Sequence, residues 1–173
     1  CSSSNALAFD GTNDYVNISS NPLTSATSFT YEAWVYVRTH KNWSRILEMG
    51  NGPGISMYLA TSNALTGIPF FAINVGAGEQ QLTSTSALPT NQWKHIAVTL
   101  SGTTATMYID GVVVGQNTTF NLNPASLGST SINRIGRSLT ASHGYFDGIL
   151  DEVRFWNVAK TQSQIQAGMV HSM

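Results

Sequence analysis

Five aspartates and four glutamates supply all the side-chain carboxylates of this chain, and three of the aspartates stand out by position. Asp10 and Asp14 flank a short turn near the start of the sequence. Asp151 lies in the alternating segment 146–157, on the same predicted strand face as Val153 and Phe155, which we expect to be buried. A bare carboxylate on a buried face costs several kcal/mol, roughly. We therefore expect Asp151 to be paired, hydrogen-bonded or bound to a metal.

The acidic residues do not form the pair that sugar hydrolysis requires. Retaining glycosidases hold two carboxylates ~5–5.5 Å apart, which on a strand means acids at alternating positions. Glu32 has no acidic neighbour on its predicted face, and Glu48 stands equally alone. Asp151 and Glu152 are adjacent, so we expect them to point to opposite faces. No nucleophile, base and acid occur in a pattern that indicates a catalytic triad. We therefore expect no enzymatic activity.

Aromatic residues near predicted loops are candidates for ligand binding, because exposed rings stack on sugar faces while polar neighbours bind hydroxyl groups. Two groups fit this description, and they are Trp43 with His40 and Arg45, and Tyr145 with His143 and Arg137. Trp34 and Tyr36, beside Glu32, are a further possibility on a strand face. The alternative for any of these residues is ordinary packing.

The composition is typical of an extracellular β-protein. Of the 173 residues only 10% are charged, against ~25% in an average domain, and Ser, Thr, Asn and Gly take their place. The net charge is −1 with no basic run, which argues against nucleic acid and against a polybasic membrane contact. No apolar run approaches the ~20 residues of a transmembrane helix. We therefore expect a secreted or cell-surface protein.

The single cysteine, Cys1, rules out a disulfide within the chain. It is open to two interpretations: a processing boundary, or a lipid-modified cysteine that anchors the protein. Under either one, residues 1–4 are a tether or a processing remnant.

Alternating apolar residues predict many short strands. The clearest is 28–38, where Phe29, Tyr31 and Val35 share one face. Asp110-Gly111 between two apolar runs predicts a hairpin. Thr161 and Gln164 match a capping box, so we expect a short helix over about 162–168. A dozen strands with almost no helix indicate a two-sheet sandwich or barrel.

Four groups of residues, in order along the chain, resemble the laminin-G-like, concanavalin A-like lectin/glucanase family in its bacterial LamG type 3 form. They are 7–11 with 14–16, 29–35, 93–99 leading to 108–111, and 134–137 followed by 148–157. The resemblance implies an all-β fold, a two-sheet antiparallel jelly-roll sandwich with one short C-terminal helix, in one domain over residues 1–173. It also makes Trp34, Trp93 and Trp156 framework positions.

The resemblance further implies a structural calcium ion near the join of the first and last strands. Asp10, Asp14 and Asp151 are its candidate ligands, since calcium takes six to eight oxygens. The alternative is that Asp10 caps a turn while Asp151 accepts hydrogen bonds from loop amides or pairs with Arg154 or Arg137. On function, the resemblance favours a non-catalytic, lectin-like carbohydrate-binding module. A structural or adhesion module that contacts protein is the alternative, and a polysaccharide hydrolase is the third choice.

Overall fold

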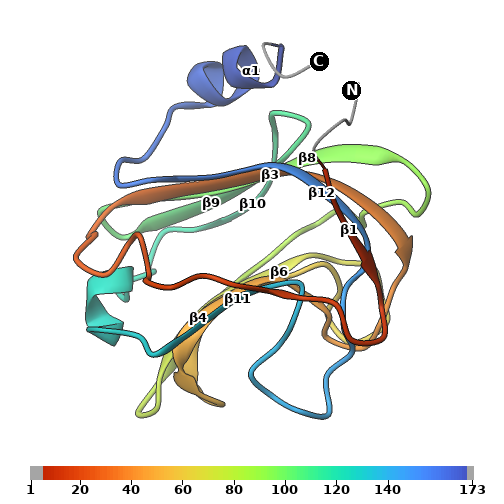
Figure 1. The fold of residues 1–173 in the computed structure, drawn as a ribbon. Coiled ribbons are helices and arrows are strands. Elements are labelled where there is room, and N and C mark those ends of the chain that lie inside the picture. Colours follow the sequence, from red (N-terminus) through yellow and green to blue (C-terminus); the bar gives the residue numbers. More distant parts are fainter. Residues whose placement is uncertain (1–5, 171–173) are drawn as a thin grey trace.

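A computed structural model describes residues 6–170, so Cys1 and the expected tether 1–4 lie outside the described part. Twelve strands form two six-stranded antiparallel sheets stacked face to face (Figure 1). The upper sheet in Figure 1 contains, in spatial order, β1 (Leu7–Asp10), β12 (Asp147–Trp156), β3 (Phe29–Thr39), β8 (Trp93–Ser101), β9 (Thr104–Ile109) and β10 (Val112–Asn117). The lower sheet contains β2 (Val16–Asn17), β11 (Ile132–Ile135), β4 (Arg45–Gly52), β5 (Ile55–Ala60), β6 (Phe70–Val75) and β7 (Glu79–Thr83). Two short helices complete the fold, the 3-10 helix η1 (Pro124–Leu127) and the α-helix α1 (Gln162–Val170). This architecture confirms the predicted jelly-roll sandwich with one C-terminal α-helix.

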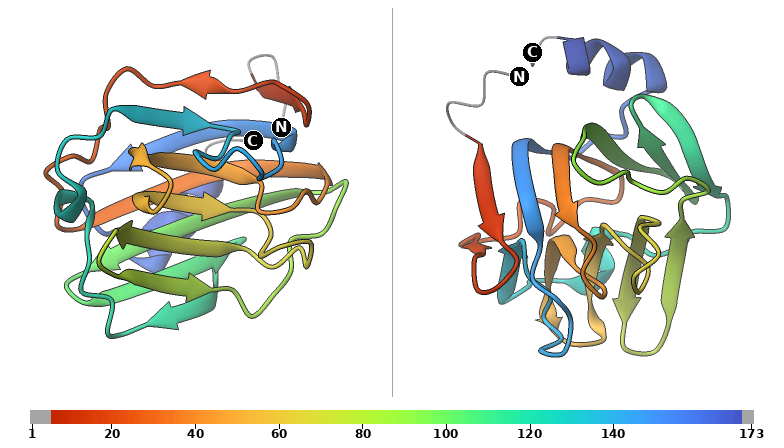
Figure 2. Two further views of the ribbon diagram at one scale, coloured as in Figure 1. Left: turned by 90° about the horizontal axis from the view of Figure 1, so that it is seen from below. Right: turned by 90° about the vertical axis from the view of Figure 1, so that its right-hand side faces the viewer.

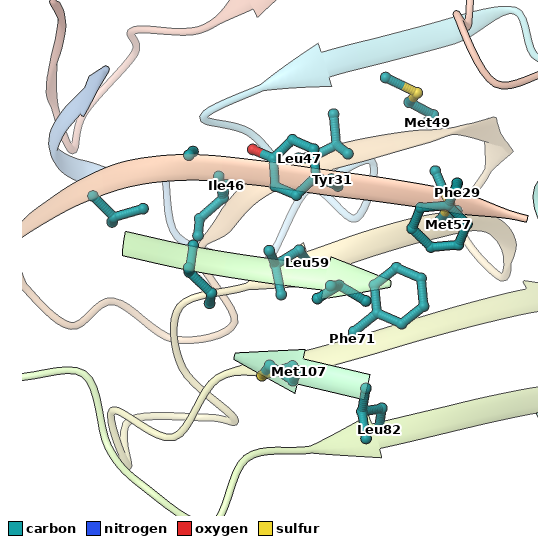
Figure 3. Packing of buried hydrophobic residues seen from close by; sticks show 14 of the residues in the cluster. Phe29, Tyr31, Ile46, Leu47, Met49, Met57, Leu59, Phe71, Leu82 and Met107 are labelled. Atoms are coloured by element: carbon teal, nitrogen blue, oxygen red, sulfur yellow. The ribbon is translucent and has the colours of Figure 1, made fainter. Parts of the chain in front are cut away.

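The core lies between the two sheets and follows from strict alternation in β3. Phe29, Tyr31, Val35 and Val37 point inward and are at most 1% exposed. Figure 3 shows Phe29 and Tyr31 packing among Leu, Ile, Met and Phe side chains that include residues from β4 and β5. Burying each such side chain contributes about 1.5–3 kcal/mol. This core holds β3 in the middle of the upper sheet.

The predicted hairpin and helix are both present. Asp110 and Gly111 adopt positive φ angles of 50° and 71°, as the tight turn between β9 and β10 requires. At the start of α1, the amide of Thr161 donates to Gln164 Oε1 at 2.9 Å, and the amide of Gln164 donates to Thr161 Oγ1 at 3.3 Å. This is the reciprocal capping box expected from the sequence.

Helix α1 covers part of the outer face of the upper sheet (Figure 1). Its residue Ile165 is fully buried against Ala97 of β8 and Tyr108 of β9. The segment leading into the helix is also fixed, because Thr30 Oγ1 donates to the carbonyl of Val158 at 2.8 Å and accepts from the amide of Lys160 at 2.8 Å. The two sheets therefore differ, because within residues 6–170 the α-helix lies on the outer face of the upper sheet.

The predicted inward orientation of Asp151 is wrong, because β12 contains a bulge. Asp151 pairs with Trp34 while Arg154 pairs with Glu32, so β12 has one extra residue at this point. Glu152 takes up the irregularity with a φ of 52°. Before the bulge Leu150 is buried in the core, and after it Val153 and Phe155 pack against the core. Asp151 therefore lies on the outer face of the upper sheet, half-buried, and accepts a hydrogen bond from the amide of Glu152 at 2.8 Å.

Candidate ligand-binding site

A second bulge places a buried ion pair on the outer face of the lower sheet. Arg45 pairs with Ala60 and Leu47 pairs with Leu59, so one extra residue lies in β4 at this point. Arg45 and Glu48, three residues apart, therefore reach the same face, whereas regular alternation would separate them. Arg45 Nε donates to Glu48 Oε2 at 3.0 Å, and both side chains are only 3% exposed.

Glu48 connects the sheet to the loop between β11 and β12. Besides the bond from Arg45, its carboxylate accepts hydrogen bonds from Ser56 Oγ on β5 at 2.8 Å, from Ser138 Oγ at 2.9 Å and from the amide of Leu139 at 3.1 Å. A buried carboxylate is stable when its oxygens are satisfied in this way. The loop 136–146 is consequently held against the outer side of the lower sheet, where Figure 1 shows it extending below the strands.

Trp43 and His143 form an aromatic stack beside this ion pair. Their ring centroids lie 6.0 Å apart with an interplanar angle of 26°. The edge of Trp43 also packs on Phe70 of β6 at 5.4 Å, and its carbonyl accepts from Arg45 Nη1 at 3.0 Å. Trp43 and His143 both remain half-buried, so part of each ring faces solvent. A partly exposed pair of aromatic rings of this kind could stack on a sugar.

The hydrogen bonds of Ser138 determine which nitrogen of His143 is available to a ligand. Ser138 has one hydroxyl hydrogen, which goes to Glu48 because a carboxylate can only accept. The 3.0 Å contact between Ser138 Oγ and His143 Nδ1 is then a bond donated by the imidazole, and it is shorter than the 3.4 Å contact of Arg45 Nη2, which can only donate, with the same nitrogen. The other nitrogen, Nε2, is left as an acceptor for a ligand hydroxyl group.

An apolar group lies beside the ion pair on the same face. Tyr58, Ala60, Phe70 and Ala72 form a buried cluster of their own, against which Trp43 packs. The guanidinium of Arg45 lies 3.9 Å from the centre of the Tyr58 ring. Burial raises the pKa of Tyr58 well above its usual range, with the negative charge of Glu79 adding to the effect. Tyr58 therefore stays neutral, and its ring packs against the guanidinium of Arg45.

Tyr145 lies in the same loop but contacts a different cation. The guanidinium of Arg137 lies 4.0 Å above the Tyr145 ring and 6.0 Å from the ring of Tyr15. Arg134, on β11, lies 5.1 Å from that same Tyr15 ring. We name Tyr15, Arg134, Arg137 and Tyr145 the arginine–tyrosine patch. It adjoins the Trp43–His143 stack through the shared loop, and it is open at the surface rather than enclosed.

The structure brings three of the five predicted binding residues into direct contact. Trp43, Arg45 and His143 touch one another, although Arg45 is buried and so positions the rings rather than meeting a ligand. Tyr145 lies farther along the same loop. His40 lies apart from them, with its Nε2 at 2.9 Å from the carbonyl oxygen of Leu88, a contact that ties two loops together.

The three predicted calcium ligands do not form one site. Asp10 pairs with Asp147 across β1 and β12, and Asp151 lies four residues farther along β12, which is ~13 Å at strand spacing. Asp10 Oδ1 caps its own turn by accepting from the amides of Thr12 and Asn13, and these bonds lower the pKa of Asp10. Asp14 Oδ2 accepts from the amide of Asp10 at 3.0 Å. Within residues 6–170 no group of three acidic, histidine or cysteine side chains is placed to hold a metal.

Glu32, the other isolated carboxylate, is covered on the opposite side of the molecule. It is 1% exposed, and its Oε1 accepts from Lys160 Nζ at 2.7 Å and from Trp156 Nε1 at 2.9 Å. His95 lies 3.9 Å from its other oxygen. Trp156 thus acts as part of this packed arrangement, and a polymer could not reach Glu32 without displacing the segment before α1.

Sequence reasoning missed Glu48 and Ser138 as parts of the site. The hydrogen bond between them joins residues 90 positions apart, and no local sequence pattern predicts it. The one available signal was the apolar pair Ile46-Leu47, both buried, which interrupts strict alternation in β4 and indicates a bulge.

The pH dependence of stability provides a test of this site. Burial and the charge of Arg45 hold the pKa of His143 below its ordinary value, while Glu48 opposes them. As pH falls below ~6.5, His143 gains its proton in the unfolded chain before it does so in the folded one. The free energy of unfolding should therefore fall between pH 7.5 and 5.5, measured by urea denaturation.

His143→Gln should reduce that loss. Burial also lowers the pKa of His95, on the upper sheet, so His95→Gln should remove a separate part of the loss. If His143→Gln and the unaltered protein lose the same stability between the two pH values, the arrangement around His143 is wrong.

In the described part of the chain, no helix is both long and apolar enough to cross a membrane. A sequence search of curated proteins found no match.

Solved structures with the same fold include several with bound or recognised sugars. Domain 4 of AbnA, an extracellular arabinanase from Geobacillus stearothermophilus solved with arabinotriose, has a TM-score of 0.80 at 19% identity and covers 94% of this chain and 75% of that one. The CBM40 of the Ruminococcus gnavus IT-sialidase, bound to α2,3-sialyllactose, has a TM-score of 0.78 at 11% identity, covering 94% and 95%. A botulinum neurotoxin type C structure, described as interacting with two ganglioside molecules, has a TM-score of 0.67 at 12% identity, covering 94% and 42%.

These identities are low, so the likeness establishes the fold alone. The sequence itself is more specific, because residues 10–166 match the Laminin_G_3 family profile, described as the concanavalin A-like lectin/glucanases superfamily. That match covers most of the chain and confirms the resemblance drawn from the sequence motifs. The chain is a member of the Laminin_G_3 family of the concanavalin A-like lectin/glucanases superfamily.

Proposed function

We propose that this chain is a non-catalytic carbohydrate-binding module that binds its glycan on the outer face of the lower sheet. The observation that carries the proposal is the half-exposed Trp43–His143 stack, fixed from beneath by the buried Arg45–Glu48 pair. It combines a ring face for stacking with a hydrogen-bond acceptor at its edge. The three related structures named above support the same interpretation, since each is described with a sugar or ganglioside.

The two sheet faces differ in a way that favours the lower one. On the upper sheet, α1 and the segment before it cover part of the outer face, and Glu32 is paired there with Lys160 of that segment and with Arg154 of β12. On the lower sheet, the loop 136–146 frames the surface without covering Trp43 completely. Figure 2 (left) shows this sheet from below, with β11 and β4 next to the loop that carries His143 and Tyr145.

Catalysis is not part of this proposal. Glu48, the carboxylate nearest the Trp43–His143 stack, is 2% exposed and fully occupied by hydrogen bonds, so it can neither protonate nor attack a sugar. The proposal places the module outside the cell, where polysaccharides and surface glycans are found. A structural or adhesion module that contacts protein remains the alternative, and binding assays decide between them.

Trp43→Ala should abolish or strongly weaken glycan binding on an array while leaving the fold intact. Loss of a stacking ring of this kind should weaken affinity roughly tenfold to hundredfold, which is about 1.4–2.8 kcal/mol. Trp93→Ala is the matched control, because Trp93 is a half-buried tryptophan on the upper sheet that packs against Tyr36. Equal loss of binding in both variants would refute the proposed site. A failure of the unaltered protein to bind any glycan would refute the proposed function.

Calcium binding is a separate proposal that rests on the family resemblance. The described residues do not supply three side-chain ligands, so an ion near Asp10 and Asp14 would need backbone carbonyls and water for most of its six to eight oxygens. Calcium should raise the Tm by several degrees relative to EDTA, and Asp14→Asn should remove that rise while Asp151→Asn should not. Identical melting curves in calcium and in EDTA would contradict calcium binding altogether.

A further inference from the structure

The positive charges of the chain are unevenly neutralised. Eight lysines and arginines are present, all within residues 6–170. Five of them form ion pairs, namely Arg38 with Asp147, Arg45 with Glu48, Lys94 with Asp110, Arg154 with Glu152, and Lys160 with Glu32. Among the described residues, Lys41, Arg134 and Arg137 have no carboxylate within ion-pair distance. Two of these three, Arg134 and Arg137, belong to the arginine–tyrosine patch.

Arg134 lacks a partner for a structural reason. It lies directly across the β11–β4 ladder from Glu48, on the same outer face. Glu48 would be its natural partner, but that carboxylate is committed to Arg45, Ser56, Ser138 and the amide of Leu139. The Nε of Arg134 is buried and has no hydrogen-bond acceptor within the described part of the protein. Such groups normally have a partner, and none of the described residues supplies one to this guanidinium.

Aromatic rings hold both guanidinium groups in place without neutralising them. The Tyr15 ring contacts both, at 5.1 Å from the guanidinium of Arg134 and 6.0 Å from that of Arg137. The Tyr145 ring lies 4.0 Å from the guanidinium of Arg137. A cation over a ring keeps its full charge and its N–H donors, and the ring limits its motion. The nearest acid in sequence, Asp14, already accepts a hydrogen bond from the amide of Asp10.

Two ordered, unpaired arginines are a recognition site for an anion with planar or tetrahedral oxygens. Arginine donates two parallel hydrogen bonds to a carboxylate, sulfate or phosphate, and these charge-assisted bonds are about twice as strong as neutral ones. The patch is linked to the Trp43–His143 stack through the ion pair, because Arg134 pairs with Glu48 across β11 and β4, and Glu48 binds Arg45, which contacts both rings of the stack. A sugar stacked on Trp43 could therefore carry its anionic group, or that of the next residue, to the patch.

We propose that the glycan is acidic, and that Arg134 and Arg137 bind its carboxylate or sulfate ester while Trp43 and His143 bind the sugar ring. This inference rests on the proposed carbohydrate-binding function and narrows its substrate class. The electrostatics agree, since the two guanidinium groups have no carboxylate within ion-pair distance and form the only cluster of unpaired arginines among the described residues.

Calorimetry on matched pairs of saccharides tests the proposal. One arm compares trigalacturonate with its methyl ester, and the other compares lactose 3′-sulfate with lactose, so that the two arms distinguish a carboxylate from a sulfate ester. In at least one arm the acidic member should bind about tenfold more tightly at low salt, and the advantage should shrink as salt rises. Arg134→Gln and Arg137→Gln should each remove most of the difference, with binding of the neutral member unchanged.

Two controls separate this site from general electrostatics. Lys94→Gln removes the same charge from the upper sheet, where Lys94 pairs with Asp110, and should leave the preference intact. Arg137→Lys keeps the charge but loses the paired donors, and should lose most of the preference. Equal affinity for acidic and neutral members, with Trp43→Ala still abolishing binding, would overturn the acidic preference and leave the proposed function standing. Failure of every glycan on an array to bind would overturn both.

Discussion

The buried ion pair between Arg45 and Glu48 is the constraint on which the rest of the candidate site depends. Removing two opposite charges from water is costly, and the cost is offset only when geometry and surrounding hydrogen bonds are good. Here the carboxylate accepts four hydrogen bonds. The guanidinium donates to the carbonyl of Trp43 and packs against the ring of Tyr58. Every one of these partners belongs to a segment that shapes the ligand-binding surface. The pair therefore acts as an internal tie rather than as a surface charge.

The outer faces of the two sheets of this jelly roll differ in what covers them and in which side chains they present. The upper sheet is partly covered on its outer side by α1, and Glu32 is enclosed there by its ion pairs (Figure 1). The lower sheet bears an aromatic stack, an imidazole acceptor and two unpaired arginines, and the loop 136–146 contributes His143 and Arg137 to them. The family fold hosts many functions on the same scaffold, so this loop, rather than the sandwich, carries what is specific to the chain.

Much of the fold could be predicted from local patterns. The inward face of β3, the Asp110-Gly111 hairpin and the capping box of α1 each depend on residues close in sequence, and all three are present. The bulges could not be predicted with the same method, because a one-residue slip inverts every later orientation. Asp151 was assigned to the wrong face for that reason. The sequence does carry a sign of the bulge. Leu150 shares its alternation with the polar residues Glu152 and Arg154, and Asp151 shares its own with the apolar Val153 and Phe155.

The candidate site was predictable only in part. Loop aromatics with polar neighbours led to Trp43 and His143, which do stack. The sequence could not show that Arg45 is buried, because that depends on Glu48 reaching the same face across a bulge. Nor could it show that the Arg134 guanidinium lies over the Tyr15 ring, since the two residues are more than a hundred positions apart. The short pairing of β2 with β11 brings them together. Long-range contacts of this kind are set by the packing of the sheets.

The most direct measurement of the central claim is amide hydrogen exchange in Glu48→Gln. Loss of the carboxylate leaves Arg45 buried and unpaired and weakens the bonds to Ser138 and Leu139. The amide of Leu139 and the loop 137–145 should exchange at least about tenfold faster, while the amides of β3 stay protected and show that the sandwich is folded. Glu79→Gln, a half-buried acid on the neighbouring edge strand β7, should leave the loop unchanged. Unchanged protection of the loop in Glu48→Gln would contradict the account.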